Sequence, residues 1–128
     1  MSEPSYPEDL KYHPEHDWAR IEGDEATMGV TWYAQDSLGE VVFYEGPEVG
    51  AEVKKDEPYA EVESVKAVSD VIAPLSGEVI AVNDSLADAP EAVNADPYAT
   101  GWLIKIRISD PAEADELMDS ATYSASLE

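Results

Sequence analysis

One lysine stands out among the residues that could do chemistry. Lys66 lies midway between two runs typical of β-strands, and no glycine, proline or asparagine marks the turn there. Its neighbours Val65 and Ala67 are apolar, where a hairpin tip is normally polar. An exposed amine at such a tip can be acylated, which replaces a cation with a neutral amide and gives a tethered arm. The alternative is an ordinary solvated lysine paired with Glu63 or Asp70.

Motifs of the common enzyme classes are absent from the sequence. It contains no Gly-x-Ser-x-Gly elbow, no phosphate-binding loop and no Gly-x-Gly-x-x-Gly fingerprint. Because 29 residues are acidic, proximity in sequence selects no carboxylate pair for acid/base catalysis. The sequence therefore shows no catalytic apparatus, and we do not expect an enzyme.

Two histidines raise the question of a metal site. His13 and His16 are separated by Pro14 and Glu15, and the proline argues against both lying in one helix. Asp17 could be a third ligand, but a fourth ligand is missing and the chain contains no cysteine. We expect surface or turn histidines and no metal. Without cysteine, any redox chemistry must come from an attached group.

The charge excludes one class of partner. With 29 acidic and 7 basic residues, the net charge of −22 would repel nucleic acid. The acids could form a docking surface for a basic partner, or they could be an adaptation to concentrated salt, which screens self-repulsion. They are scattered along the chain, which favours the second explanation, a halophilic cytoplasm. The same charge opposes self-association at low salt, so we expect a monomer.

Location follows from two further observations. No apolar run approaches the roughly 20 residues that span a bilayer, and the first residues have neither the basic stretch nor the apolar core of an export signal. We expect a cytoplasmic protein that does not bind membranes.

The elements that must position Lys66 are mostly strands. Residues 1–8 predict a loose lead-in, and residues 9–128 a single domain. Short helices are expected near 32–38, with Thr31 as N-cap and Gly39 at the end, and near 111–119, packed by Leu117 and Met118. The stretch 83–100 reads as irregular. Alternating or β-branched runs predict strands at 18–22, 26–30, 41–44, 49–53, 59–63, 68–73, 78–82 and 102–108.

A weak internal similarity links residues 49–56 to residues 76–84, since each has a glycine, a valine-rich strand and a polar turn. Two such halves around a central hairpin suggest two sheets with approximate two-fold symmetry.

Several ordered blocks resemble the glycine cleavage system H protein family. The segment around Lys66, residues 63–70, followed by residues 73–79, resembles the family's lipoyl-attachment region. Agreement extends from about Leu10 to the C-terminus, in the family's order. The other blocks are Lys11-Tyr12, His16-Asp17-Trp18, Gly29-Val30-Thr31, Tyr33-Ala34-Gln35, Leu38-Gly39, Pro47-Glu48-Val49-Gly50, Val93-Asn94, Asp96-Pro97-Tyr98 and Gly101-Trp102-Leu103.

The resemblance implies a specific carrier. It implies a flattened β-structure, the barrel-sandwich hybrid, with lipoate attached to Lys66 as an amide. The arm would receive the aminomethyl group from glycine at the pyridoxal-phosphate glycine decarboxylase, deliver it to the tetrahydrofolate-dependent aminomethyltransferase, and be reoxidised by dihydrolipoyl dehydrogenase. A lipoate-attaching enzyme would be a fourth partner. A tethered arm raises the effective concentration of its reactive group at each enzyme.

The resemblance also implies a shelter for the carried group. The family protects it in a surface cleft in which carboxylates face its cationic amine, and the matching positions are Glu15, Asp17 and Asp70. The alternative is that they are three more solvated acids.

Two other carrier roles remain open on this scaffold. One is a lipoyl carrier for another route, such as lipoate relay. The other is a biotin carrier, whose lysine is usually flanked by methionines rather than by the Val65 and Ala67 seen here.

Overall fold

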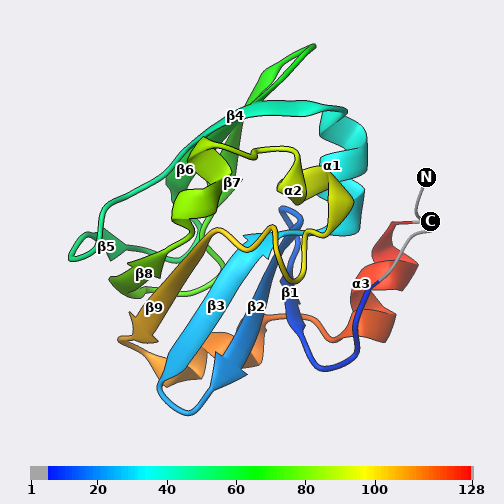
Figure 1. The fold of residues 1–128 in the computed structure, drawn as a ribbon. Coiled ribbons are helices and arrows are strands. Elements are labelled where there is room, and N and C mark those ends of the chain that lie inside the picture. Colours follow the sequence, from blue (N-terminus) through cyan, green and yellow to red (C-terminus); the bar gives the residue numbers. More distant parts are fainter. Residues whose placement is uncertain (1–5, 128) are drawn as a thin grey trace.

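Two antiparallel sheets make up most of the structure, a computed structural model that describes residues 6–127 (Figure 1). The larger sheet contains, in spatial order, β1 (Lys11–His13), β2 (Asp17–Glu22), β3 (Glu25–Val30), β9 (Ile104–Ile108), β8 (Gly77–Val82) and β5 (Glu52–Val53). The smaller sheet contains β4 (Val41–Glu45), β6 (Pro58–Ser64) and β7 (Val68–Ile72). The predicted mainly β fold with two sheets is confirmed, while the approximate two-fold symmetry stays a prediction.

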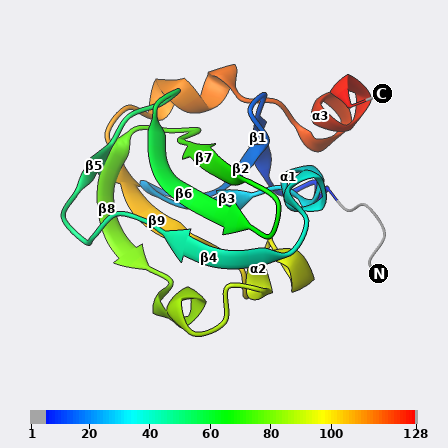
Figure 2. The same cartoon turned by 90° about the horizontal axis from the view of Figure 1, so that it is seen from above.

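The apolar faces of the two sheets enclose the main core. Alternation along β6 buries Ala60 and Val62 and exposes Glu61 and Glu63, as expected for a strand with one solvated face. Figure 2 shows the sheets curving around this core, with the C-terminal segment running along the outside. A second, aromatic cluster joins the N-terminal region to the C-terminal helix. Its buried members are Leu10, Tyr12, Trp18, Tyr98 and Tyr123.

The predicted helix over residues 32–38 is present as α1 (Trp32–Leu38). The Thr31 side chain accepts a hydrogen bond from the Ala34 backbone at 3.2 Å, which caps the helix start. At the other end, Gly39 adopts a φ of 80° and its N–H donates to the Gln35 carbonyl. Both local signals in the sequence therefore act as predicted.

The stretch between β8 and β9 is more ordered than predicted. It contains a 3₁₀ helix, η1 (Asp84–Ala87), and one turn of α-helix, α2 (Ala92–Ala95). In this stretch, the side chain of Asn94 donates a hydrogen bond to the Gly39 carbonyl at 2.8 Å and accepts one from the Val41 N–H at 2.8 Å. These bonds fasten the link between α1 and β4.

The C-terminal segment differs from the single helix predicted over residues 111–119. A 3₁₀ helix, η2 (Pro111–Glu116), ends before Leu117, and a separate helix, α3 (Ser120–Ser126), follows. The physical reason is a backbone pairing, because Tyr12 and Met118 exchange two hydrogen bonds of 2.8 Å each, which requires extended backbone at Met118. Asp119 then caps α3 through the Thr122 N–H.

Part of the predicted lead-in, residues 1–5, lies outside the described residues. Within the described part, the Tyr6 ring packs edge-on against Tyr12 and Tyr123, with centroid distances of 6.4 and 5.4 Å. Among residues 6–127, no helix is both long and apolar enough to cross a membrane.

Candidate functional site

Lys66 lies at the exposed tip of the hairpin formed by β6 and β7, which projects at the top of Figure 1. Ser64 closes the turn. Its N–H donates to the Ala67 carbonyl at 2.8 Å, and its hydroxyl accepts from the N–H groups of Lys66 and Ala67 at 3.3 and 3.1 Å. These side-chain bonds explain how the turn forms without glycine, proline or asparagine. The predicted hairpin position of Lys66 is therefore seen in the structure.

The tip is held against the segment that links α1 to β4. The Val65 N–H donates to the Glu40 carbonyl at 3.1 Å. The stem of Lys66 lies across Gly39, so that a Cβ added to this glycine would lie 3.4 Å from Cε and 3.9 Å from Nζ. Asn94, which fastens the same segment, is therefore a remote support of the tip.

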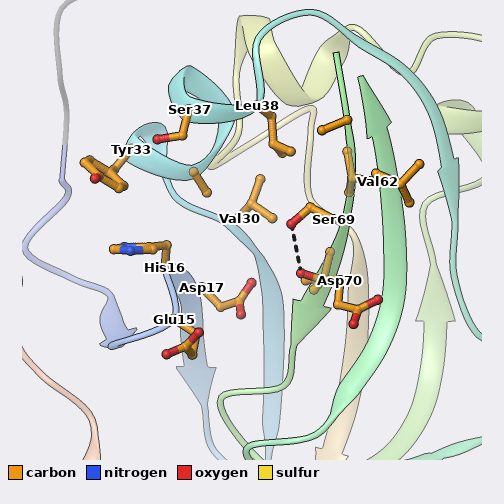
Figure 3. Close-up of a pocket in the computed structure, with 14 residues that line it drawn as sticks. Glu15, His16, Asp17, Val30, Tyr33, Ser37, Leu38, Val62, Ser69 and Asp70 are labelled. Atoms are coloured by element: carbon orange, nitrogen blue, oxygen red, sulfur yellow. Dashed lines mark hydrogen bonds between the residues drawn. The ribbon is translucent and has the colours of Figure 1, made fainter. Parts of the chain in front are cut away.

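A cavity of about 300 Å³ adjoins the hairpin on its inner side (Figure 3). This volume is at the lower end of the range for small-molecule pockets. Part of its wall is apolar and comes from β3, α1, β6, β7 and the turn between β6 and β7. The apolar lining residues are Val30, Ala34, Leu38, Val62, Ala67, Val68 and Val71.

The three predicted carboxylates, Glu15, Asp17 and Asp70, all line this cavity. Their positions differ. Glu15 is exposed in the turn before β2, and Asp17 is buried at the first position of β2. Asp70 is exposed on β7, and in Figure 3 its carboxylate points away from Asp17, whereas the Asp17 carboxylate points into the cavity.

Asp17 is an unusual member of this set because its side chain is shut off from solvent, with only 1% of the residue exposed. Burial raises the pKa of Asp17 well above its usual range, against the effect of a hydrogen bond from the Ile72 backbone. Its Oδ2 has no hydrogen-bond partner within residues 6–127. The same holds for the buried hydroxyls of Tyr44 and Tyr59. An unpaired buried carboxyl is costly, so Asp17 is suited to receive a hydrogen-bond donor.

His13 differs from the surface or turn residue that was expected, whereas His16 does lie in a turn. His13 is buried, and its Nε2 lies 2.6 Å from Asp56 Oδ1, while its Nδ1 accepts from the Glu15 backbone. The described residues contain no cluster of three or more potential metal ligands.

His16 forms part of the cavity wall, which the sequence analysis did not identify. It adopts a φ of 74° in the turn before β2, its ring lies 4.5 Å from that of Tyr33, and its Nδ1 lies 2.8 Å from the Tyr123 hydroxyl. The Tyr123 hydroxyl also contacts Thr31 Oγ1 at 2.8 Å. The C-terminal helix therefore holds one wall of the cavity. The ordered block His16-Asp17-Trp18 was a signal for this role, but its partner in α3 is more than 100 residues away.

The arrangement suits a long acyl arm on Lys66. An exposed primary amine can form an amide, and the apolar wall beside it can cover an aliphatic chain. The buried carboxyl of Asp17, with its unpaired oxygen, can accept hydrogen bonds from a polar or cationic group at the end of such an arm. Lipoate, an aliphatic acid that ends in a dithiolane ring, fits these residues.

Comparisons with known proteins agree on one family. A family model described as glycine cleavage H-protein matches residues 10–128. The glycine cleavage system H protein of Symbiobacterium thermophilum is 54% identical over 119 residues, covering 93% of each chain. That of Halorhodospira halophila is 55% identical over 118 residues, covering 91% of each chain. A crystal structure of a glycine cleavage system H protein from Mycobacterium marinum has a TM-score of 0.87 and 37% identity, covering 94% of this chain and 98% of that one.

Proposed function

The chain belongs to the glycine cleavage H-protein family, and from this premise we propose that Lys66 is the residue that carries lipoate. The protein is a non-catalytic lipoyl carrier of the glycine cleavage system. The observation that supports Lys66 is its place at an exposed hairpin tip beside a cavity with a partly apolar wall. The sequence block around it, residues 63–70, is the part of the chain that resembles the family's attachment region.

The chain's own residues would contact the arm at two places, an apolar one beside the hairpin and a polar one at the other end of the cavity. The apolar side chains on the hairpin side, Val62, Val68 and Val71, would cover the aliphatic portion. When bound, lipoate supplies the disulfide that a chain without cysteine lacks.

The polar end of the cavity would shelter the carried aminomethyl group. Asp17 would accept a hydrogen bond from its amine through the unpaired Oδ2, and Glu15 would add negative charge at the rim. Asp70 would contribute from the edge, and its exposed position makes it the weakest of the three. Closing the arm into the cavity would keep water from the carried group.

The partners follow from the family. Membership of the family implies that the protein interacts with the other components of the glycine cleavage system. We propose that these partners are glycine decarboxylase, aminomethyltransferase and dihydrolipoyl dehydrogenase, together with a lipoate-attaching enzyme. The carrier unit would be residues 9–128, acting as a monomer in the cytoplasm.

A reconstituted assay tests the role of Lys66. The variant Lys66→Arg keeps the charge but cannot form the lipoyl amide, whereas Lys54→Arg makes the same change at another exposed turn lysine. Each variant is incubated with the lipoate-attaching enzyme and then with the other three enzymes, and glycine-dependent formation of methylenetetrahydrofolate is followed. We expect no turnover with Lys66→Arg and normal turnover with Lys54→Arg. Turnover with Lys66→Arg would show that another residue carries the arm.

A further inference from the structure

His13 ends β1 and lies directly opposite Asp17 in the pairing of β1 with β2. We call residues 14–16, which join these two strands, the connecting turn. It carries Glu15 and His16, which line the cavity together with Asp17. The side chain of His13 is only 4% exposed, yet it is not among the residues that line the cavity. His13 therefore lies behind this side of the cavity wall.

Two hydrogen bonds join His13 to the connecting turn. Its carbonyl accepts from the His16 N–H at 2.9 Å, and its Nδ1 accepts from the Glu15 N–H at 3.0 Å. The second bond has the pattern of an Asx-turn, in which a side chain accepts from the N–H two residues later. The turn needs such support, because His16 has a φ of 74°, which is costly for a residue other than glycine. The His13 side chain therefore helps to fix the backbone of Glu15 and His16.

The bond to Glu15 also fixes the tautomer of His13. A ring nitrogen that accepts from a backbone N–H carries no proton, so the proton of the neutral imidazole is on Nε2. Nε2 lies 2.6 Å from Asp56 Oδ1 and donates to it, and this bond is the main cause that lowers the pKa of Asp56. Since both nitrogens are occupied, the pair lacks the free nitrogen with which a catalytic Asp–His dyad takes up a proton. The geometry is that of a support.

Asp56 is itself well fixed. It lies in the turn between β5 and β6 with a φ of 71°, and its N–H donates to the Ala73 carbonyl at 2.9 Å. Its carboxylate also lies 3.3 Å from Lys55 Nζ, which pairs with Glu116 of η2 at 3.0 Å. The imidazole of His13 therefore ties the connecting turn to the β5–β6 turn and, through Lys55, to the C-terminal segment.

We propose that His13 is a positioning residue for the shelter of the carried group, and that its neutral imidazole holds Glu15 and His16 in place on the cavity wall. This inference rests on the proposed function, in which Glu15 and Asp17 face the carried amine. Loss of the bond at Nδ1 lets the connecting turn move away from Asp17. Water then reaches the carried aminomethyl group more easily, which shortens its lifetime.

Two conservative variants separate the two bonds of the imidazole. His13→Asn places an amide oxygen near the position of Nδ1, so it keeps an acceptor for the Glu15 N–H but is too short to reach Asp56. His13→Gln reaches Asp56 and leaves the Glu15 N–H without its acceptor. The matched control is Asp110→Ala. Asp110, outside the cavity lining, also accepts from the N–H two residues later, that of Ala112, at 3.1 Å.

The test uses holoprotein whose lipoylation at Lys66 has been verified by peptide mapping. Each carrier is loaded with glycine and glycine decarboxylase and separated from that enzyme, and loss of the carried group is followed by intact mass. Hydrogen exchange of the Glu15 amide reports on the connecting turn, and urea unfolding measures the stability of each variant. Nitrogen NMR of the imidazole identifies the tautomer of His13.

We expect His13→Gln to shorten the lifetime of the carried group, and to accelerate exchange at Glu15, by about fivefold each, as for the loss of one net hydrogen bond. His13→Asn should stay within about twofold of wild type in both, even where urea unfolds it as easily as the glutamine variant. Asp110→Ala should change neither quantity. In wild type, Nδ1 of His13 should be unprotonated.

A purely structural role would make the lifetime follow stability rather than the bond at Nδ1. Equal lifetimes of the asparagine and glutamine variants would therefore overturn the inference, as would a proton on Nδ1 in wild type. A carrier that lacks lipoate on Lys66, or that the decarboxylase cannot load, would instead contradict the proposed function, so the two failures are distinguishable.

Discussion

The side chain of Lys66 lies across Gly39, with its Cε 3.4 Å from the position that a Cβ on this glycine would occupy. Gly39 also ends α1 with a φ of 80°, a conformation that L side chains rarely adopt. One glycine therefore serves both the end of the helix and the close approach of the lysine stem. This contact links the position of the modified residue to the fold beneath it.

Gly39→Ala should destabilise the protein and slow lipoylation. The backbone strain costs about 1–3 kcal/mol, and the methyl group would lie in van der Waals contact with the lysine stem and restrict its conformations. Gly23→Ala is a matched control, because Gly23 has a φ of 67° but nothing within 4 Å of an added Cβ. Chemical denaturation and the rate of enzymatic lipoylation measure the two effects. If both variants were lipoylated at the same rate, the contact with Lys66 would have no role in modification.

Ser64→Ala should loosen the hairpin tip. The buried hydroxyl accepts two backbone N–H groups of the turn, and losing it should cost about 1 kcal/mol. Ser69→Ala removes a hydroxyl from the same hairpin whose hydrogen bond, to the Asp70 carbonyl, is 3.4 Å long. Hydrogen exchange of the Lys66 and Ala67 amides should accelerate only in the Ser64 variant. Unchanged protection there would mean that Ser64 does not hold the turn.

Asp17→Asn should change how stability depends on pH. Because the pKa of Asp17 is raised by burial, the folded state holds its proton more tightly than the unfolded chain does. Asp17 therefore disfavours folding progressively as pH rises from its unfolded pKa towards its raised folded pKa. The asparagine variant escapes this loss, so its stability relative to wild type should increase with pH across that window.

The measurement is urea unfolding of both proteins at a series of pH values, with Asp70→Asn as the control for removing one exposed carboxylate. A constant difference between Asp17→Asn and wild type at every pH would show that Asp17 is ionised normally in the folded protein.

Tyr123→Phe should weaken the attachment of α3 to the cavity wall. The hydroxyl bridges His16 and Thr31 at 2.8 Å each, and deleting it should cost about 1–3 kcal/mol because buried partners lose a bond. Tyr33→Phe removes another hydroxyl from a residue that lines the cavity. We expect a shorter lifetime of the carried aminomethyl group in the Tyr123 variant than in wild type. Equal lifetimes in the two variants and wild type would contradict this role of the C-terminal helix.

The net charge of −22 predicts that stability rises with salt. Molar KCl shortens the Debye length to about 3 Å and screens repulsion among the carboxylates. Thermal unfolding followed by circular dichroism between low and molar KCl would measure the change. Equal melting temperatures across the series would rule out the high-salt adaptation that the scattered acids suggest.

The elements that local signals define were predictable from the sequence. Thr31 caps the start of α1 and Gly39 ends the helix, each through contacts within a few residues. Along β6, buried and exposed residues alternate as in a strand with one solvated face. The hairpin position of Lys66 followed from the strand-like runs on either side. Glu15, Asp17 and Asp70 were singled out by family resemblance, since nothing local distinguishes them among 29 acids.

The features that were missed depend on contacts between distant segments. The burial of Asp17 and the His16–Tyr123 contact join parts of the chain that are far apart in sequence. The C-terminal helix prediction relied on Pro111 and the acids after it, but pairing of Met118 with Tyr12 overrides that local preference. A sequence pattern indicates the local conformational preference of a segment. Hydrogen bonds to distant segments can override that preference, as they do at Met118.

Mass analysis of the protein purified from cells that are degrading glycine tests the central claim most directly. The account predicts that intact wild-type protein carries one lipoyl group, that peptide mapping places it on Lys66, and that Lys66→Ala lacks it while Lys54→Ala retains it. Unmodified wild-type protein in such cells, or a lipoyl group that persists in Lys66→Ala, would contradict the account.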